Sequence, residues 1–352
     1  MIIYYLVFAT ILICYLFEYY VVNFQKIALI FLFFILSFFA GLRAIDVSRD
    51  GLNYAYMFDS VSQYSDWFSS RNELMAVVIP VTLKKLEIYS YISAFLTFAL
   101  IGVGLKLLAI KKYSPLPLLS VLLYYSNFFI LHEMTQIRAG IATGILLLTI
   151  DDIYQKKFGK FLFKIFAASL FHFSSLAFLP IFFVNPKKIN RLVYFIVLIV
   201  AILLGLAKGI NVFKLIPGLS NLNSKLAMYD ALQNQMVEVN LFNVTMLINI
   251  FAISLQLLFI KRVKSISKYS IIIIKIMFFG VVSLYVFSSI PVIAWRVSEL
   301  FLTISFINLT YLYYIIRPRF ISNTIVILIA LLMIFLGLFR QGLLQPYHTL
   351  LS

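Results

Sequence analysis

Apolar runs of helical length, separated by short polar stretches, repeat along the whole chain. A helix that crosses a membrane needs about 20 mainly apolar residues, and ten segments approach or reach that length. The pattern therefore predicts an all-α, polytopic integral membrane protein that forms a single transmembrane domain over residues 1–352. The predicted spans are Ile2 to Val22, Ile27 to Leu42, Tyr89 to Ile110, Pro115 to Leu131, Ile137 to Ile153, Leu192 to Ala207, Leu241 to Ile260, Tyr269 to Ile290, Val297 to Ile316 and Ile321 to Phe339.

Composition supports the same class. The chain of 352 residues is 63% hydrophobic and 12% charged, which is more apolar surface than one soluble core can bury. Its formal net charge of +16 is explained by the positive-inside rule, so no nucleic-acid partner is expected. The single cysteine, Cys14, excludes an intrachain disulfide framework. The start of the chain at Met1 lacks a basic region and a cleavage site, which predicts an uncleaved first span.

Basic residues predict the topology. Groups of basic residues, mostly lysine, follow several apolar spans, and we expect these flanks to lie in the cytoplasm. Both termini and two long loops, residues 43–88 and 208–240, then lie outside. The basic groups are Lys111 with Lys112, Lys156 with Lys157 and Lys160, Lys261 to Lys268, and Arg317 with Arg319.

One segment, Phe161 to Val184, is long enough for one crossing, yet basic groups flank it on both sides. If both flanks are cytoplasmic, the segment enters the membrane and returns, with its turn near Phe171 to Ser175. Irregular backbone at that depth is tolerated where it lines a cavity or is buried in protein. We therefore expect a re-entrant hairpin and about 10 to 12 transmembrane helices in all. The alternative is a single crossing.

The cations on the outer side are chemically distinct. They are largely arginine, whose planar fork of donors suits bidentate phosphate binding. Arg138 lies between long apolar runs, where a guanidinium is costly unless it faces protein, water or an anion. The outer face is thus typical of an anion site. The alternative for each arginine is to reach the interface or to pair with an acid such as Asp46, Asp50 or Glu299. The outer arginines are Arg43, Arg49, Arg71, Arg138, Arg296 and Arg340.

The first outer loop combines polar groups with aromatic rings. Asp50 and Asn53 precede Tyr54, and Trp67 follows. Carboxylate and amide groups beside aromatic faces suit a sugar. An aromatic belt at the level of the lipid headgroups explains the rings equally well.

The second outer loop carries apolar residues at helical spacing. They predict an amphipathic helix that lies on the surface and could act as a lid. The residues are Leu222, Leu226, Tyr229, Leu232 and Met236, behind Ser220 and Asn221 as caps.

No motif of a soluble enzyme is present. The chain has no phosphate-binding glycine loop, no His-Glu-x-x-His pattern and no Gly-x-Ser-x-Gly elbow. Its three histidines are scattered. Asp151 and Asp152 lie beside cytoplasmic lysines, where a solvated helix end is the simpler interpretation. We therefore expect no metal site and no cofactor.

Several motifs occur in order between residues 41 and 347. The main ones are Gly41-Leu42-Arg43 followed by Asp50 and Asn53-Tyr54, then Gln136-Ile137-Arg138-Ala139-Gly140-Ile141-Ala142, then Ala168-Ser169-Leu170-Phe171-His172-Phe173-Ser174-Ser175-Leu176. Weaker ones are Trp295-Arg296-Val297-Ser298-Glu299 and Gln345-Pro346-Tyr347. In these motifs the chain resembles the Wzy-type O-antigen and exopolysaccharide repeat-unit polymerases, the EpsG-like family. The first motif departs from the family, which often has Gly-Xaa-Asp-Thr where this chain has Ser48-Arg49-Asp50-Gly51.

The resemblance implies a GT-C-like membrane glycosyltransferase bundle in the bacterial inner membrane, with its active site facing the periplasm. Such an enzyme transfers a growing glycan from undecaprenyl pyrophosphate to a new lipid-linked repeat unit, without a metal ion. The implied partners are undecaprenyl-pyrophosphate-linked oligosaccharides, the lipid bilayer and a membrane protein that regulates chain length.

The resemblance also implies roles for the outer arginines. Arg43 and Arg138, followed by Arg296, would bind the pyrophosphate and stabilise the charge that develops on the leaving group. Tyr54, Trp67 and Tyr347 are candidates for binding the glycan.

A proton acceptor is needed for the attacking hydroxyl. His172 suits this role, and Asp50 or Glu299 could substitute for it. A purely structural role for His172 in the hairpin turn is the alternative. His132 and Glu133 are further candidates, or the pairing partners of Arg138.

Three other functions remain as alternatives. An O-antigen ligase shares the chemistry and differs in its acceptor. A membrane O-acyltransferase of surface glycans usually has a histidine early in the chain, whereas the first histidine here is His132. A lipid-linked-oligosaccharide flippase would show polar residues along a central pathway and often internal repeats, and we detect no repeat.

Overall fold

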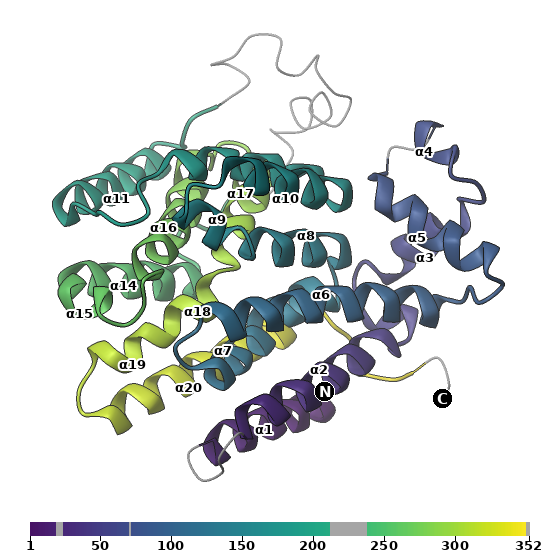
Figure 1. Cartoon of the computed structure of the whole chain (residues 1–352), viewed down its shortest axis with the longest axis horizontal. Coiled ribbons are helices and arrows are strands. Elements are labelled where there is room, and N and C mark those ends of the chain that lie inside the picture. The colour runs from purple at the N-terminus through teal and green to yellow at the C-terminus, as the bar shows by residue number, and fades with distance from the viewer. Residues whose placement is uncertain (19–23, 70–71, 212–237, 350–352) are drawn as a thin grey trace. The chain divides into compact units, whose positions relative to one another are not determined.

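The computed structural model describes residues 1–18, 24–69, 72–211 and 238–349. Within these ranges every element is helical, and β-pairing is limited to two isolated bridges (Figure 1). The predicted all-α fold class is therefore confirmed. The chain divides into two compact units, Met1–Phe182 with Ile316–Ser352, and Phe183–Ile315. The single transmembrane domain stays a prediction.

Three helices in the described ranges are long and apolar enough to cross a membrane. They are α2 (Phe24–Gly41), α6 (Tyr91–Tyr113) and the continuous helix Arg319–Arg340, which comprises α20 (Arg319–Phe335) and η7 (Leu336–Arg340). A fourth is obtained if the pair Pro291–Leu302 and Ser305–Ile315, bent by 43°, counts as one span. Several other predicted spans hold helices of only 10–17 residues. The helices are consistent with a membrane protein, but 10 to 12 crossings are not confirmed.

In the first unit, α2 packs lengthwise against α6. The close approach needs Gly41, because a Cβ there would lie 2.6 Å from the Cα of Leu96. At its start, α6 is fixed by a capping box between Ser90 and Ser93. The other helices of this part are α1 (Ile2–Phe17), α7 (Pro117–Tyr124), α8 (Ile137–Leu147) and α9 (Ile150–Tyr154).

A π-helical segment, η2 (Tyr125–Glu133), continues α7. It directs Glu133 into the bundle, where Lys106 Nζ lies 2.5 Å from the carboxylate and both side chains are buried. Gly102 leaves the space for this carboxylate, since a Cβ there would lie 2.1 Å from Glu133 Oε2. Local π-helix often marks a functional or strained position, and here it positions a buried ion pair.

The segment around His172 turns back on itself. Helix α10 (Phe158–Phe171) is followed by the 3-10 helix η3 (Phe173–Phe183), and each arm is roughly 20 Å long. The far ends of the two arms meet again, because Lys156 Nζ donates to the carbonyl of Phe182 over 2.6 Å and the rings of Phe158 and Phe182 are 4.9 Å apart. The chain thus reverses near His172, where the turn was predicted, and the re-entry of this segment into a membrane stays a prediction.

The first outer loop is folded into short helices rather than extended. Helices α3 to α5 gather at one end of α6 (Figure 1). The elements are η1 (Ile45–Val47), α3 (Gly51–Asp59), α4 (Asp66–Ser69) and α5 (Leu74–Lys85).

Residues Leu343–Thr349, here called the C-terminal strap, run along residues 43–49 of that loop. Backbone hydrogen bonds join Ala44 N to the carbonyl of His348 (2.9 Å) and Gln345 N to the carbonyl of Val47 (2.8 Å). The last part of the described chain therefore covers the start of the first outer loop.

The second unit is a separate helical bundle around α16, whose residues are mostly buried. Gln256 and Asn308 exchange side-chain amide hydrogen bonds of 2.6 and 2.9 Å in its interior. Its elements are α11 (Arg191–Leu206), α14 (Val244–Leu258), α15 (Ile260–Lys264), α16 (Ser270–Val286), α17 (Pro291–Leu302), α18 (Ser305–Asn308), η6 (Leu309–Tyr311) and α19 (Leu312–Ile315). The amphipathic helix predicted over Leu222 to Met236 lies outside the described residues.

Candidate functional site

Arg138, Glu73 and His172 form a chain of charged and titratable groups in the first unit. Arg138 Nη1 donates to Glu73 Oε2, and His172 Nδ1 lies 3.7 Å from Glu73 Oε1. The three side chains are 24%, 9% and 17% exposed, respectively. One carboxylate thus bridges the two residues that the sequence singled out for the leaving group and the proton.

Three separate helices position these side chains. Arg138 lies in the first turn of α8, Glu73 is the N-cap residue of α5, and His172 is the C-cap residue of α10. The positive end of a helix dipole disfavours a cation in the first turn, so Arg138 requires a nearby anion. Glu73 supplies it, and its own position at a helix N-terminus favours the carboxylate form.

Two residues of the first outer loop complete the group. The ring of Tyr54 lies 5.6 Å from the guanidinium carbon of Arg138, an arrangement that permits a cation–π contact. Burial raises the pKa of the Asp50 carboxyl above its usual value, and the guanidiniums of Arg49 and Arg138 only partly oppose this. The group therefore combines a guanidinium (Arg138) and an imidazole (His172) with two carboxylates and a phenol. All of these residues except Glu73 were candidates from the sequence.

Arg43 occupies a separate, fully buried position near Tyr54. Its Nη1 donates to the carbonyl of Ala40 and its guanidinium stacks over the ring of Phe95 at 4.3 Å. Burial lowers the pKa of Arg43 to about 10. In the described part of the chain, its Nε and Nη2 atoms have no hydrogen-bond partner and no carboxylate forms a salt bridge with it. A buried guanidinium with free donors is costly, so it is suited to receive an anion.

The candidate glycan-binding aromatics lie in different surroundings. Tyr54 is buried beside Arg138, whereas Trp67 is 38% exposed on α4. Tyr347 belongs to the C-terminal strap, and its hydroxyl donates to the carbonyl of Phe39 over 3.0 Å. Only Tyr54 is therefore built into the group around Arg138.

Arg296 and Glu299 belong to the second unit. Both are on α17, where Arg296 is exposed and Glu299 is half-buried, three residues further along the same helix. The group described around Glu73 contains neither of them. Their predicted roles as pyrophosphate ligand and proton acceptor stay predictions.

The predicted pairing of Arg138 with His132 or Glu133 is wrong. Glu133 pairs with Lys106 and also accepts a hydrogen bond from the hydroxyl of Tyr124 at 3.0 Å. His132 is fully buried, with Nδ1 3.3 Å from the hydroxyl oxygen of Thr143. The π-helical geometry turns these side chains into the bundle, which residue spacing on a regular α-helix does not reveal.

The adjacent acids Asp151 and Asp152 each pair with a lysine. Lys112 Nζ lies 3.1 Å from Asp151, and Lys164 Nζ lies 2.5 Å from Asp152. Among the residues that the structure describes, no group of three or more His, Cys, Asp or Glu side chains could hold a metal ion.

Glu73 is the member of the site that sequence reasoning missed. It lies in the long first outer loop without a motif of its own, and the ion pair joins positions 65 residues apart. One signal was present, because an arginine between apolar runs needs a counterion and Glu73 directly precedes the mainly apolar stretch Leu74 to Lys85.

Comparison with known proteins identifies the relatives of this chain. The amylovoran biosynthesis protein AmsC of Erwinia amylovora is 27% identical over 192 residues, a match that covers 51% of this chain and 50% of AmsC. The match thus spans about half the length of that relative, and no solved structure matches. The model of the EpsG family matches residues 26–349, which confirms the resemblance seen in the motifs. The chain belongs to the EpsG family.

Proposed function

We propose that this protein is a membrane glycosyltransferase that polymerises repeat units of an exopolysaccharide or O-antigen. It transfers a growing glycan from undecaprenyl pyrophosphate to a new lipid-linked repeat unit. Membership of the EpsG family and the similarity to AmsC support this class of protein. The bridge from Arg138 through Glu73 to His172 is the structural observation that carries the proposal.

The reaction makes one glycosidic bond and breaks one bond to phosphate. A hydroxyl of the incoming repeat unit attacks the anomeric carbon of the growing glycan. The bond from that carbon to the pyrophosphate oxygen breaks, and its electron pair leaves with undecaprenyl pyrophosphate. The proton of the attacking hydroxyl passes to a base on the protein.

Arginines stabilise the departing pyrophosphate. Arg138 has one donor directed to Glu73 and a buried Nε with no partner in the described residues. Arg43 has two such atoms. Donors aimed at the oxygen on which charge develops lower the barrier, and each is worth about 3 kcal/mol in comparable enzymes. Because these cations supply the stabilisation, the proposed reaction is independent of a metal ion.

His172 is the proposed base. The carboxylate of Glu73 beside its Nδ1 favours a proton on that nitrogen, which leaves Nε2 as the basic atom. Glu73 acts as a positioning residue because it holds the imidazole and the guanidinium at once. Asp50 is the second choice for the base, and Tyr54 offers a ring for sugar stacking.

The location follows from the same proposal. Lipid-linked repeat units are joined on the periplasmic side of the bacterial inner membrane, and the first outer loop carries most of the group. A membrane protein that regulates chain length is the proposed protein partner.

The test is complementation of a strain that lacks the gene, read by electrophoresis of the surface glycan. Arg138→Ala should abolish long chains and leave one repeat unit on the lipid anchor, whereas Arg340→Ala, at an exposed arginine, should restore the full ladder. Arg138→Lys and the melting temperature of each purified variant separate loss of chemistry from loss of fold.

Other outcomes assign other functions. Long polymer made by Arg138→Ala contradicts the proposed site. Polymer that stays on its lipid carrier in the deletion strain indicates a ligase. Absence of any extracytoplasmic glycan indicates a flippase, and an intact ladder without acyl groups indicates an acyltransferase.

A further inference from the structure

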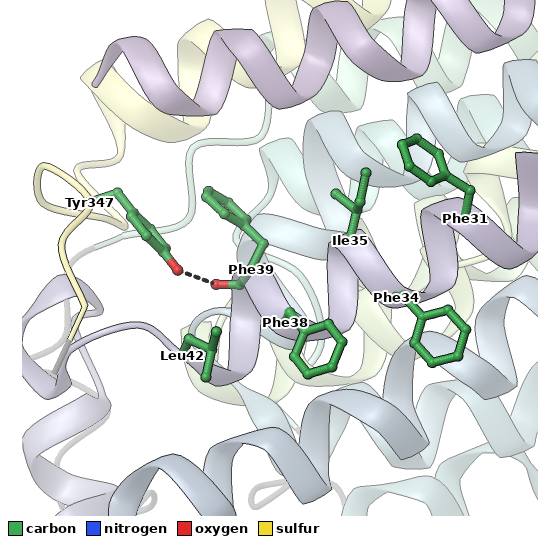
Figure 2. Close-up of a pocket in the computed structure, with 7 residues that line it drawn as sticks. All are labelled: Phe31, Phe34, Ile35, Phe38, Phe39, Leu42 and Tyr347. Carbon is green, nitrogen blue, oxygen red and sulfur yellow. Dashed lines mark hydrogen bonds between the residues drawn. The ribbon is translucent and has the colours of Figure 1, made fainter. Parts of the chain in front are cut away.

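An apolar groove runs along α2 as far as Leu42, the residue that precedes the buried Arg43. Its volume is about 460 Å³ and it is open along one side; the volume is within the range of pockets that bind small molecules. Figure 2 shows its side chains in a row along the helix, with Tyr347 at one end. The lining residues are Phe31, Phe34, Ile35, Phe38, Phe39, Leu42 and Tyr347.

The lining of the groove is extended and apolar. Its lining residues in and directly after α2, from Phe31 to Leu42, span twelve positions, or roughly 16 Å at helical rise, and all of them are apolar. The side chains of Phe31, Phe34 and Phe38 are 43–49% exposed. Such a surface accepts a linear hydrocarbon chain and offers nothing to a sugar.

Tyr347 closes the end of the groove. Its ring stacks on Phe39 with a centroid distance of 4.4 Å, and its hydroxyl donates to the carbonyl of Phe39 (Figure 2). It also lies close enough to Arg43 for the guanidinium to oppose the rise in the pKa of Tyr347 that burial causes. Tyr347, a residue of the strap, thus contacts the apolar lining and lies near the buried cation.

Arg43 gives the groove its charge complementarity. The residue directly follows Leu42 of the lining, and its Nε and Nη2 atoms have no partner in the described chain. A ligand with a hydrocarbon chain and an anionic head would fill the groove and satisfy both donors.

We propose that the α2 groove holds the isoprenoid chain of a polyprenyl pyrophosphate lipid, whose pyrophosphate reaches Arg43 when Tyr347 moves aside. The choice of this lipid rests on the proposed function. The lining residues from Phe31 to Leu42 contact the hydrocarbon part, and Tyr347 is the side chain that must be displaced.

The test is photo-crosslinking of the full chain in nanodiscs. p-Benzoylphenylalanine replaces Phe34 in the groove or, as the matched control, Ile30, an exposed residue of the same helix outside the groove. Undecaprenyl pyrophosphate and undecaprenol are the two probes, and adducts are measured by mass spectrometry. Because a charged hydrogen bond contributes at least 1.4 kcal/mol, we expect about ten-fold more adduct with the pyrophosphate than with undecaprenol at Phe34.

Variants test the walls of the groove separately. Ile35→Trp should fill it and reduce the Phe34 adduct, whereas Ile30→Trp should leave the adduct unchanged. Arg43→Gln should remove the preference for pyrophosphate, and Arg43→Lys should retain part of it. Unchanged melting temperatures show that the variants fold.

Equal labelling by the two probes, or equal labelling at Phe34 and Ile30, would show bulk lipid contact and overturn the proposal. This outcome is independent of polymerisation. If the strain makes long glycan but the protein forms no selective adduct, the proposed function is supported and the proposal for the groove is contradicted. If the protein forms the selective adduct but does not polymerise glycan, the proposal for the groove is supported and the proposed function is contradicted.

Discussion

Glu73 and Arg138 are joined by an ion pair that links the start of α5 to the start of α8, and the second oxygen of the same carboxylate faces His172. The pair connects the first outer loop to the helical bundle through side chains that are 9% and 24% exposed. Because Glu73 contacts both the proposed base and a proposed pyrophosphate ligand, it is the most informative residue to change.

Glu73→Gln should reduce polymerisation while the protein still folds. The amide keeps the shape of the side chain but removes the charge that holds Arg138 and orients His172. A positioned acid–base group contributes about 10²- to 10⁴-fold to a rate, so we expect the rate of chain extension to fall by about 10²-fold or more. Transfer of labelled repeat units in membrane vesicles measures it.

Glu87→Gln is the matched control, since Glu87 is exposed in the same loop. It should retain full transfer. Normal transfer by Glu73→Gln would show that the bridge is only structural, and partial rescue by Glu73→Asp would support the role of the charge.

Asp50 gives a dependence of stability on pH. Burial raises the pKa of this carboxyl in the folded protein, so the folded state binds the proton more tightly than the unfolded state, whose pKa is about 3.9. The contribution of Asp50 to the free energy of unfolding therefore decreases as pH rises through the interval between the two pKa values. Asn has no ionisable carboxyl group, so the variant Asp50→Asn does not lose this stability as the pH rises.

The melting temperature of Asp50→Asn relative to the wild type should consequently be higher at pH 7 than at pH 4. Differential scanning fluorimetry in detergent measures both proteins at both pH values. A difference that does not change with pH, or one that favours the wild type at pH 7, contradicts the expectation.

Lys106 and Glu133 should be coupled energetically. Lys106→Met leaves a carboxylate in the protein interior without its cation, which costs about 3–5 kcal/mol for a buried pair. In the double variant Lys106→Met with Glu133→Gln, the neutral amide can still accept from Tyr124, so most of that loss should be recovered. Chemical unfolding in detergent gives the three free energies.

Lys112→Met is the control, because its partner Asp151 forms a pair that is 46% and 20% exposed. Exposed pairs contribute about 0–1 kcal/mol. Additive losses in the double variant at Lys106 and Glu133 would show that the two side chains do not depend on each other.

The hairpin at His172 predicts that both of its flanks lie on one side of the membrane. In a Cys14→Ser background, cysteines placed at Lys157 and Lys188 should both react with an impermeant thiol reagent only after the membrane is opened. Labelling of one position in intact cells, and of the other only in opened membranes, would mean a single crossing. Both positions are exposed, so failure to label in opened membranes is not expected.

Much of this protein could be predicted from hydropathy and charge. Apolar periodicity located the helices because burial of apolar surface determines where they form. The basic residues on both sides of residues 161–184 predicted a reversal of the chain, and the turn lies at His172. Chemical type and the family resemblance together selected Arg43, Asp50, Tyr54, Arg138 and His172 as candidates, and their roles stay predictions.

The rest depends on contacts between distant residues or on local backbone geometry. The partner of Arg138 is 65 positions away, and no periodic pattern links the two. The orientation of Glu133 follows from a π-helical segment, whereas helical reasoning assumes 3.6 residues per turn. The predicted number of crossings is not confirmed, because several predicted spans contain breaks or helices shorter than a membrane requires.

The strap has a consequence for biosynthesis. The hydroxyl of Tyr4, near the start of the chain, donates to the carbonyl of Gln345, 341 positions later, and backbone bonds from the strap hold residues 44 to 49. Chains are made and inserted from the N-terminus, and early segments can fold before later ones emerge. The surroundings of Arg43 are therefore incomplete until the residues of the strap have been synthesised. Burial of this charge thus follows the translation of residues 343–349.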